Sequence, residues 1–271
     1  MKLTTKIVLG IIAAIFLLSL IFIIGFSFTD RVNENNERPD DDISQENITP
    51  VEVKPYKTIW LDETRMSDEY NVHPTGNFKF RPLINPEDEN KLFLPEELLQ
   101  FADFISSNDT LIIRLKTKEI HDKYSEKKNE KKYLIRQISG FNFSANINAV
   151  NVISNLDIKI DVKNITTDKI SINTRGEIVI DSCKADIIEP ITNCKLKLKN
   201  SQVKELNIDL DVMGNFEVEN CNIEVENLTG GKYHHVQQPK SEARTVNWLP
   251  KNKEARLQVL LLGDTARIVF P

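Results

Sequence analysis

Asp209 and Asp211 are the two residues of this chain whose type and spacing could do chemistry together. They stand two positions apart in the alternating run ELNIDLDV, which begins at Glu205. On a β-strand this spacing places both carboxylates on one face, roughly 6.5 to 7 Å apart, near the separation of paired glycosidase carboxylates. A polysaccharide-acting enzyme that uses this outward acidic pair is therefore one hypothesis. Any alternating acidic strand has the same geometry, and no neighbouring Arg, His or aromatic residue supports the pair, so we expect no catalysis and no catalytic residues.

The adjacent residues His234 and His235 are candidates for metal binding. They follow the run GGKY, and adjacent residues on a strand point to opposite faces. The chain has no HxH or HxxxH spacing, so a polar loop is favoured and we predict no metal site. It also lacks GxSxG, Walker-type and GxGxxG motifs. We therefore predict no cofactor.

Three cysteines, Cys183, Cys194 and Cys221, each follow a polar residue, in DSCKADI, TNCKLKL and ENCNIEV. An odd count is unlike the disulfide framework of small secreted domains. Small buried residues at corners of the fold are favoured over a zinc ligand or a nucleophile.

Short alternating runs dominate residues 141–228 and must position all of these side chains. Examples are LDIKIDV, EIVID, KLKLKN and FEVENCNIEVEN, and such period-two patterns predict β-strands. EIVIDSCKADIIE and NFEVENCNIEVEN align at an offset of 38, while CKLKLKN and CNIEVEN align at 27, which indicates an irregular repeat. The breaks are too short for crossover helices, and Asn-Gly or Asp-Gly hairpin turns are absent. An irregular, single-stranded β-solenoid, resembling a β-helix, is favoured over an antiparallel sandwich.

This architecture predicts which side chains face the interior. Leu156, Ile158, Ile160 and Val162 should point inward. The outward set should form a ladder of opposite charges between neighbouring strands, and it comprises Lys195, Lys197, Lys199, Asn207, Asp209, Asp211, Glu224 and Glu226.

The sequence outside this region predicts a few further elements. PEELLQFADFI, from Pro95, is predicted to be one short helix, and the charged tract from Glu119 to Lys132 an exposed loop. Two strands around Gly263-Asp264 are predicted to close the domain as a hairpin. Trp60 and Trp248 are candidate core anchors, and either could stack on a sugar only if exposed.

The first 55 residues predict a membrane anchor and a tether. Ile7 to Phe28 is an uncharged run of 22 residues, about 33 Å long as a helix, which is enough to span a bilayer. Lys2 and Lys6 precede it and no A-x-A-like cleavage site follows. A transmembrane signal anchor over residues 1–30 with a cytoplasmic N-terminus is therefore favoured over a removed secretory peptide. Residues 31–55 carry seven carboxylates and three basic residues and should form a disordered linker. Residues 56–271 then form a domain outside the cytoplasm, periplasmic or extracellular.

Several of these motifs together resemble a known family. The segment EELLQFADFISSNDTLIIRL, the β runs of ELNIDLDVMGNFEVENCNIEVENLTGG, and the glycines that open strands at Gly176 and Gly214 resemble the auto-transporter adhesin head GIN domain of bacterial envelope proteins. The resemblance covers roughly Tyr56 to Pro271. It implies a β-helix-like domain outside the cytoplasm with an adhesive or surface role and no assigned chemistry. This chain differs from the family in being rich in Asn, Asp, Glu and Lys.

Charge limits the class of partner. The net charge of −5 leaves −2 on residues 56–271 once the +1 of residues 1–30 and the −4 of residues 31–55 are set aside. A nearly neutral domain argues against nucleic acid as a partner. We therefore expect a membrane-anchored interaction domain, adhesin-like or a scaffold, that binds an envelope protein or polysaccharide.

Overall fold

The computed structural model describes residues 47–64, 72–124, 136–238, 243–261 and 267–269. All of them belong to one compact unit, Asp40–Pro271. The predicted anchor Ile7–Phe28 lies outside the described residues. Within the part of the chain that is described, no helix is long and apolar enough to cross a membrane.

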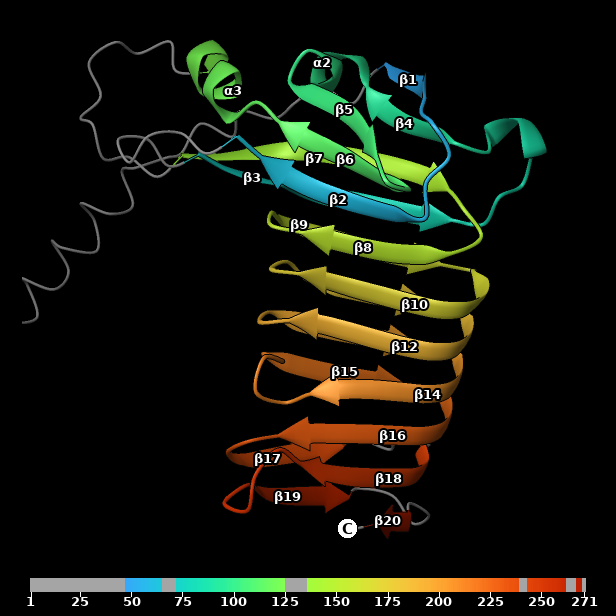
Figure 1. The fold of residues 1–271 in the computed structure, drawn as a ribbon, viewed down its shortest axis with the longest axis vertical. Helices are drawn as coiled ribbons and strands as arrows, with labels where there is room; N and C mark the ends of the chain where they lie inside the picture. The colour runs from blue at the N-terminus through green and yellow to red at the C-terminus, as the bar shows by residue number, and fades with distance from the viewer. Residues whose placement is uncertain (1–46, 65–71, 125–135, 239–242, 262–266, 270–271) are drawn as a thin grey trace, which may run out of the picture. The chain divides into compact units, whose positions relative to one another are not determined.

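Strands dominate the described residues and form three sheets (Figure 1). An eight-stranded sheet has the order β1 (Ile48–Glu52), β4 (Lys91–Pro95), β7 (Arg136–Asn146), β3 (Val72–Arg81), β9 (Asp157–Lys163), β11 (Ile178–Asp181), β13 (Lys195–Lys199) and β15 (Asn215–Glu219). A ten-stranded sheet has the order β20 (Arg267–Val269), β18 (Ala243–Pro250), β16 (Asn222–Gly230), β14 (Gln202–Asp209), β12 (Lys184–Thr192), β10 (Thr166–Thr174), β8 (Val150–Ser154), β2 (Thr58–Glu63), β6 (Thr110–Leu115) and β5 (Ala102–Ser107). The third sheet pairs β17 (Tyr233–Gln238) with β19 (Arg256–Leu261).

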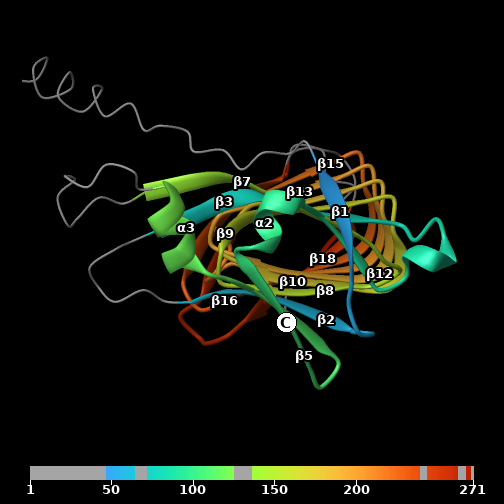
Figure 2. The ribbon, with the colours of Figure 1, turned by 90° about the horizontal axis from the view of Figure 1, so that it is seen from above.

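From β8 to β16 the chain alternates between the two large sheets, which face each other across the core in Figure 2. Every strand pair in this region is parallel, so the antiparallel alternative is wrong here. The spacing between stacked residues is 18 from Ile170 to Ile188 and 20 from Leu206 to Glu226. We call each stretch of chain that contributes one strand to each of the two large sheets a coil. Ile178 stacks on Leu196, and Leu196 stacks on Phe216, so the offset of 38 spans two coils. The offset of 27 instead aligns β13 with β16, which lie in different sheets.

The polar breaks that follow β9, β11, β13 and β15 are corners with one left-handed residue each. Asn164, Ser182, Asn200 and Asn220 have φ of 59°, 56°, 49° and 53°, each directly after a strand of the eight-stranded sheet. Asn is among the few residue types that tolerate this conformation. In every one of these corners the next side chain turns inward and is buried: Ile165, Cys183, Ser201 and Cys221.

The interior is a continuous apolar core along the coils. Leu156, Ile158, Ile160 and Val162 are 2% exposed or less, which confirms their predicted orientation. In the ten-stranded sheet, however, strict alternation fails in β12, β14 and β16. In β14, for example, two consecutive residues that are not buried, Lys204 and Glu205, separate the buried residues Val203 and Leu206. The same shift in β16 turns Glu226 inward.

Glu226 is fully buried between Leu206 and Val246 of the neighbouring strands. Its predicted outward orientation is therefore wrong, whereas Glu224 is exposed as expected. The parity of β16 is set by its register against β14, which the alternating sequence alone does not contain.

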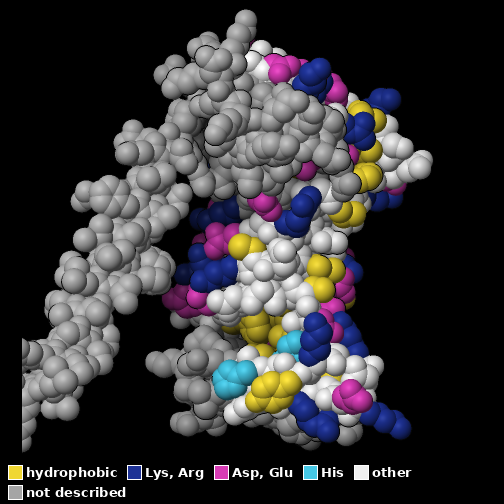
Figure 3. All heavy atoms as spheres, turned by 90° about the vertical axis from the view of Figure 1, so that its left-hand side faces the viewer, with side chains coloured by type: hydrophobic (Ala, Val, Ile, Leu, Met, Phe, Trp, Pro, Cys, Tyr) yellow, Lys and Arg dark blue, Asp and Glu magenta, His cyan; other side chains and the backbone are white. Residues whose placement is uncertain are grey.

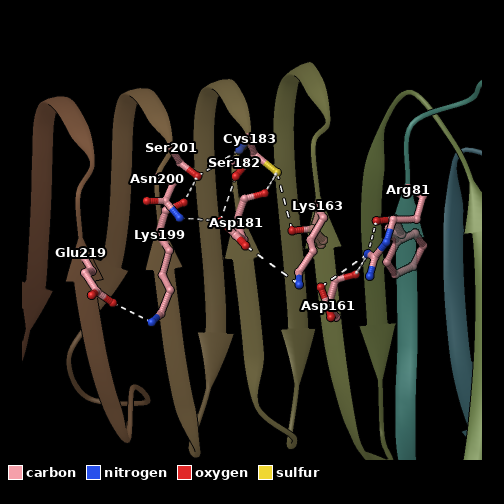
Figure 4. A network of polar contacts seen from close by, with 12 residues as sticks. Arg81, Asp161, Lys163, Asp181, Ser182, Cys183, Lys199, Asn200, Ser201 and Glu219 are labelled. Atoms are coloured by element: carbon pink, nitrogen blue, oxygen red, sulfur yellow. Dashed lines mark hydrogen bonds and ion pairs between the residues drawn. The ribbon is translucent and has the colours of Figure 1, made fainter.

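The outward face of the eight-stranded sheet carries the predicted charge ladder, with different partners. Lys195 and Lys199 of β13 pair with Glu217 and Glu219 of β15, each at 2.6 Å. Lys197 pairs at 2.5 Å with Glu177, the residue directly before β11. Asp209, Asp211 and the β16 glutamates, the partners expected from sequence, are not among these pairs. Figure 4 shows the Lys199–Glu219 pair beside the corner residues. Exposed pairs contribute little individually, but the ladder disfavours slipped registers.

Four other elements differ from the prediction. The helix at Pro95 is only α2 (Glu96–Leu99), because the following residues form β5. The tract predicted as a loop begins inside α3 (Thr117–Tyr124). A short 3₁₀ helix, η1, spans Pro86–Asp88.

The strands at the two ends of the domain also differ from the prediction. β19 and β20 join different sheets instead of forming a hairpin, and Gly263-Asp264 lies outside the described residues. β1 pairs with β4 inside the segment predicted to be a disordered linker, so ordered structure begins before residue 56.

The cysteines provide a solution test of the corners. Cys183 and Cys221 are 3% and 2% exposed, and burial raises the pKa of the Cys183 thiol, whereas Cys194 is exposed, so its predicted burial is wrong. We expect a thiol reagent to modify Cys194 of the folded protein rapidly and the other two only on unfolding. Mass spectrometry after timed labelling measures this, with a Cys194→Ser variant as control. Fast labelling of that variant would contradict the corner structure.

Candidate functional site

A cleft opens where the eight-stranded sheet ends. β15 is its last strand, whereas the ten-stranded sheet continues through β16 and β18. The following strand, β17, pairs with β19 and not with β15. A cavity of about 420 Å³ lies between β15 and β17, within the roughly 300–1,000 Å³ of typical ligand sites.

The two walls of the cleft combine apolar and polar side chains. β15 and the segment before it contribute Met213, Phe216 and Glu217, and β17 contributes His234, His235 and Val236. Figure 3 shows histidine side chains beside hydrophobic ones on this face, next to a group of charged side chains of both signs.

Asp211 organises one end of this cleft. Its carboxylate accepts a hydrogen bond from the backbone N–H of Gly231 at 2.8 Å, and it lies 3.0 Å from Nε2 of His234. Nζ of Lys251 donates to Asp211 at 2.9 Å and to both oxygens of Asp209 at 2.6 and 2.7 Å. One carboxylate therefore ties together the corner after β14, the start of β17 and the corner after β18.

The glycine pair before β17 makes room for this network. A Cβ on Gly230 would lie 2.7 Å from the imidazole of His234, and one on Gly231 would lie 3.2 Å from Asp211. The His234 ring also contacts Trp248 edge to face, with centroids 6.5 Å apart. The GG dipeptide thus allows the imidazole and the carboxylate to pack against backbone.

Hydrogen bonds and charge shift the pKa of two groups in this site, Asp211 and Lys251. The Gly231 N–H and then the Lys251 ammonium hold the pKa of Asp211 well below its usual range. Hydrogen bonds from Lys251 to Asp209 and then to Asp211 raise the pKa of that lysine. A glycosidase acid must keep its carboxyl protonated near neutral pH. Asp211 has the opposite tendency, and Lys251 bridges the proposed catalytic pair.

The sequence candidates are thus brought together in part. Asp211 and His234 are in contact, which their separation of 23 residues did not suggest. His235 is exposed and lies on the cleft wall. Within the described residues no group of three His, Cys, Asp or Glu side chains could hold a metal ion.

Sequence reasoning missed the roles of Lys251, Met213 and Phe216. Lys251 follows an ordinary strand end, and only the stacking of β14, β16 and β18 places it over Asp209. Of the two tryptophans, Trp248 is buried as a core residue, while Trp60 is half-buried on the outward face of β2.

The depressed pKa of Asp211 predicts a pH-dependent stability. A carboxylate whose pKa is lower in the folded state stabilises the protein above its unfolded pKa of about 3.9, and this contribution is lost as pH falls through the folded value. We expect Asp211→Asn to lower the Tm at pH 6 and the difference from wild type to shrink on acidification below about pH 4.

Thermal unfolding from pH 2 to pH 7 measures this effect. Asp157→Asn is the control, because Asp157 is exposed on β9, and its difference from wild type should change little with pH. A pH-independent Asp211→Asn difference would show that the ionised carboxylate is not what the network stabilises.

Comparison with solved structures found similar proteins at low sequence identity. The chain is similar to a candidate adhesin from Bacteroides fragilis, at 11% identity and a TM-score of 0.44, covering 84% of this chain and 97% of that one. It is also similar to two Parabacteroides distasonis proteins, a candidate adhesin (14% identity, TM-score 0.36, covering 83% and 94%) and a candidate lipid-binding protein (11%, 0.35, covering 82% and 96%). No family model and no curated protein sequence matches the chain. The resemblance to the GIN domain therefore stays a prediction.

Proposed function

We propose that this chain is a membrane-anchored protein of the bacterial cell envelope whose exported domain is a β-solenoid that binds another macromolecule and does not catalyse a reaction. The observation that carries this proposal is the cleft between β15 and β17, which has mixed apolar and polar walls and whose bordering carboxylates are engaged by Lys251. The parallel stacking of strands at intervals of 18 to 20 residues supports the solenoid.

The anchor belongs to the same proposal. The apolar run Ile7–Phe28, preceded by Lys2 and Lys6, is long enough for one bilayer span and favours a cytoplasmic N-terminus. The domain would then face the periplasm or the cell exterior, where an envelope protein or polysaccharide is its partner. Membrane fractions washed with alkaline carbonate should retain the full-length chain and release a variant that lacks residues 7–28.

A polysaccharide-acting enzyme is the competing function, and it has a direct test. Full-length protein in mild detergent is incubated with isolated envelope polysaccharide, and both bound carbohydrate and newly formed chain ends are measured. Binding without new ends, in the wild type and in Asp209→Asn/Asp211→Asn alike, is expected if polysaccharide is the partner. New chain ends that disappear in the double variant, with the fold intact by circular dichroism, would establish the enzyme instead.

A further inference from the structure

We propose that the cleft between β15 and β17 binds an extended segment of a partner protein, which adds as a strand to the free edge of β15. This inference rests on the proposed binding function and assigns it a partner class and a site. It starts from the fact that, within the described residues, β15 pairs with β13 alone and β17 pairs with β19 alone.

The backbone of β15 shows which groups face the cleft. The N–H of Asn215 donates to Cys194 at 2.9 Å, and the carbonyl of Glu219 accepts from Asn200 at 3.0 Å, both across the β13 side. In a strand, alternate residues direct their N–H and C=O groups to opposite neighbours. The intervening residues Phe216 and Val218 therefore direct theirs away from β13, to the open edge.

The facing wall has the same arrangement. The carbonyl of Lys232 accepts from the N–H of Arg256 at 3.0 Å, and Tyr233 is the registered partner of Arg256. In a parallel pair this geometry directs the backbone groups of His234 toward β19. Those of Tyr233 and His235 then face the other way, toward the cleft.

Two open strand edges select a polypeptide as the occupant. Alternating N–H and C=O groups are the hydrogen-bonding complement of another extended main chain, as in β-strand addition. β15 has five residues, so its edge is about 17 Å long and suits a segment of about five residues. A sugar would instead be recognised by exposed aromatic faces, whereas Phe216 of the cavity wall is half-buried against the core. Tyr233 is exposed but is not among the residues that line the cavity.

The side chains at the cleft define the sequence that fits. Phe216, Val218 and Val236 lie toward the interior, while Glu217 and His235 are exposed. Alternate residues of an added strand would face these two environments. We therefore expect a segment that alternates apolar residues with polar ones.

Random twelve-residue peptides displayed on phage provide the probe. The library is selected against the full-length protein in mild detergent, and enriched sequences are synthesised with a fluorescein label and measured by fluorescence anisotropy. Val218→Pro and His235→Pro each remove one cleft-facing N–H, and proline is tolerated at strand edges. Val218→Ala and His235→Ala are the matched controls, because they trim the same side chains but keep the N–H.

We expect alternating sequences to be enriched, and each proline variant to bind them at least tenfold more weakly than the alanine variant at the same position. If the proline variants bound the peptides as tightly as the alanine variants, strand addition would be overturned and the binding function would stand. Binding of envelope polysaccharide without any enriched peptide would have the same two consequences. Binding of neither would overturn both proposals.

Hydrogen exchange of the wild type decides the question if the proline variants do not fold. Added peptide should slow exchange at Phe216 and Val218 by at least tenfold, while Glu217, whose N–H faces β13, serves as the internal control and should not change. Unchanged exchange at Phe216 and Val218 with bound peptide would overturn strand addition.

Discussion

The Gly176→Ala variant should be severely destabilised. A Cβ at this position would lie 2.2 Å from the carbonyl oxygen of Ile158 and 2.7 Å from its carbon. Both are backbone atoms of the preceding coil, and the N–H and C=O of Gly176 are themselves held by Thr174 and Thr192. Neither the segment at Gly176 nor the one at Ile158 can move without breaking these backbone contacts. We therefore expect the free energy of unfolding to fall by about 3 kcal/mol, the upper end of overpacking costs. In a domain of this size that lowers the Tm by roughly 6 to 12 °C.

The matched control is Gly231→Ala. A Cβ there would lie 3.2 Å from Asn252 and from Asp211, in both cases from side-chain atoms that can move. Its Tm should fall by less than about 3 °C. If thermal unfolding by circular dichroism gave equal losses for the two alanines, the close approach of backbones at Gly176 would not be the cause.

The second large effect is expected from truncating Phe78. This residue of β3 is fully buried, and its ring centroid lies 4.3 Å from that of Phe80 and 5.3 Å from that of Phe143. β3 pairs with both β7 and β9, so the aromatic cluster joins the N-terminal strands to the coils. Phe78→Ala removes most of a ring from a close-packed site and should cost about 3–5 kcal/mol, with a Tm lower by roughly 6 to 20 °C.

Phe78→Leu separates cavity formation from loss of the aromatic contact. Leucine refills much of the space, so we expect less than half of the alanine effect in urea or thermal unfolding. An alanine variant as stable as wild type would mean that the cluster is not part of the cooperative core. Phe78 lies on β3, and Gly176 lies just before β11 of the same sheet. A variant that combines Gly176→Ala with Phe78→Ala tests whether the domain unfolds as one cooperative unit.

Features that depend on neighbouring residues are predictable from this sequence, whereas features that depend on contacts between distant residues are not. Leu156 to Val162 were oriented correctly because period-two alternation is a local property of a strand. The sequence marks Gly176 as a glycine that opens a strand, but the physical reason for it, the backbone of Ile158, lies 18 residues away. Glu226 was placed on the wrong face because its orientation depends on the register with β14.

The helix prediction at Pro95 shows a different limit. An amino-terminal proline and two acidic residues correctly marked the start of α2. Continuation beyond Leu99 failed because Ala102–Ser107 pairs with β6 as an edge strand, and tertiary pairing overrides the modest helix propensity of such short segments.

By itself the sequence determined that the domain is mainly β, that its strands are short, and that polar corners break them, because alternation and left-handed turn residues act within a few positions. Only the tertiary structure decided the site. Asp211, His234 and Lys251 come from three successive coils, and the cleft exists because β17 pairs with β19 and leaves the edge of β15 open. Both depend on which strands lie side by side, a choice made by packing and register over the whole stack of coils and not by any local run of residues.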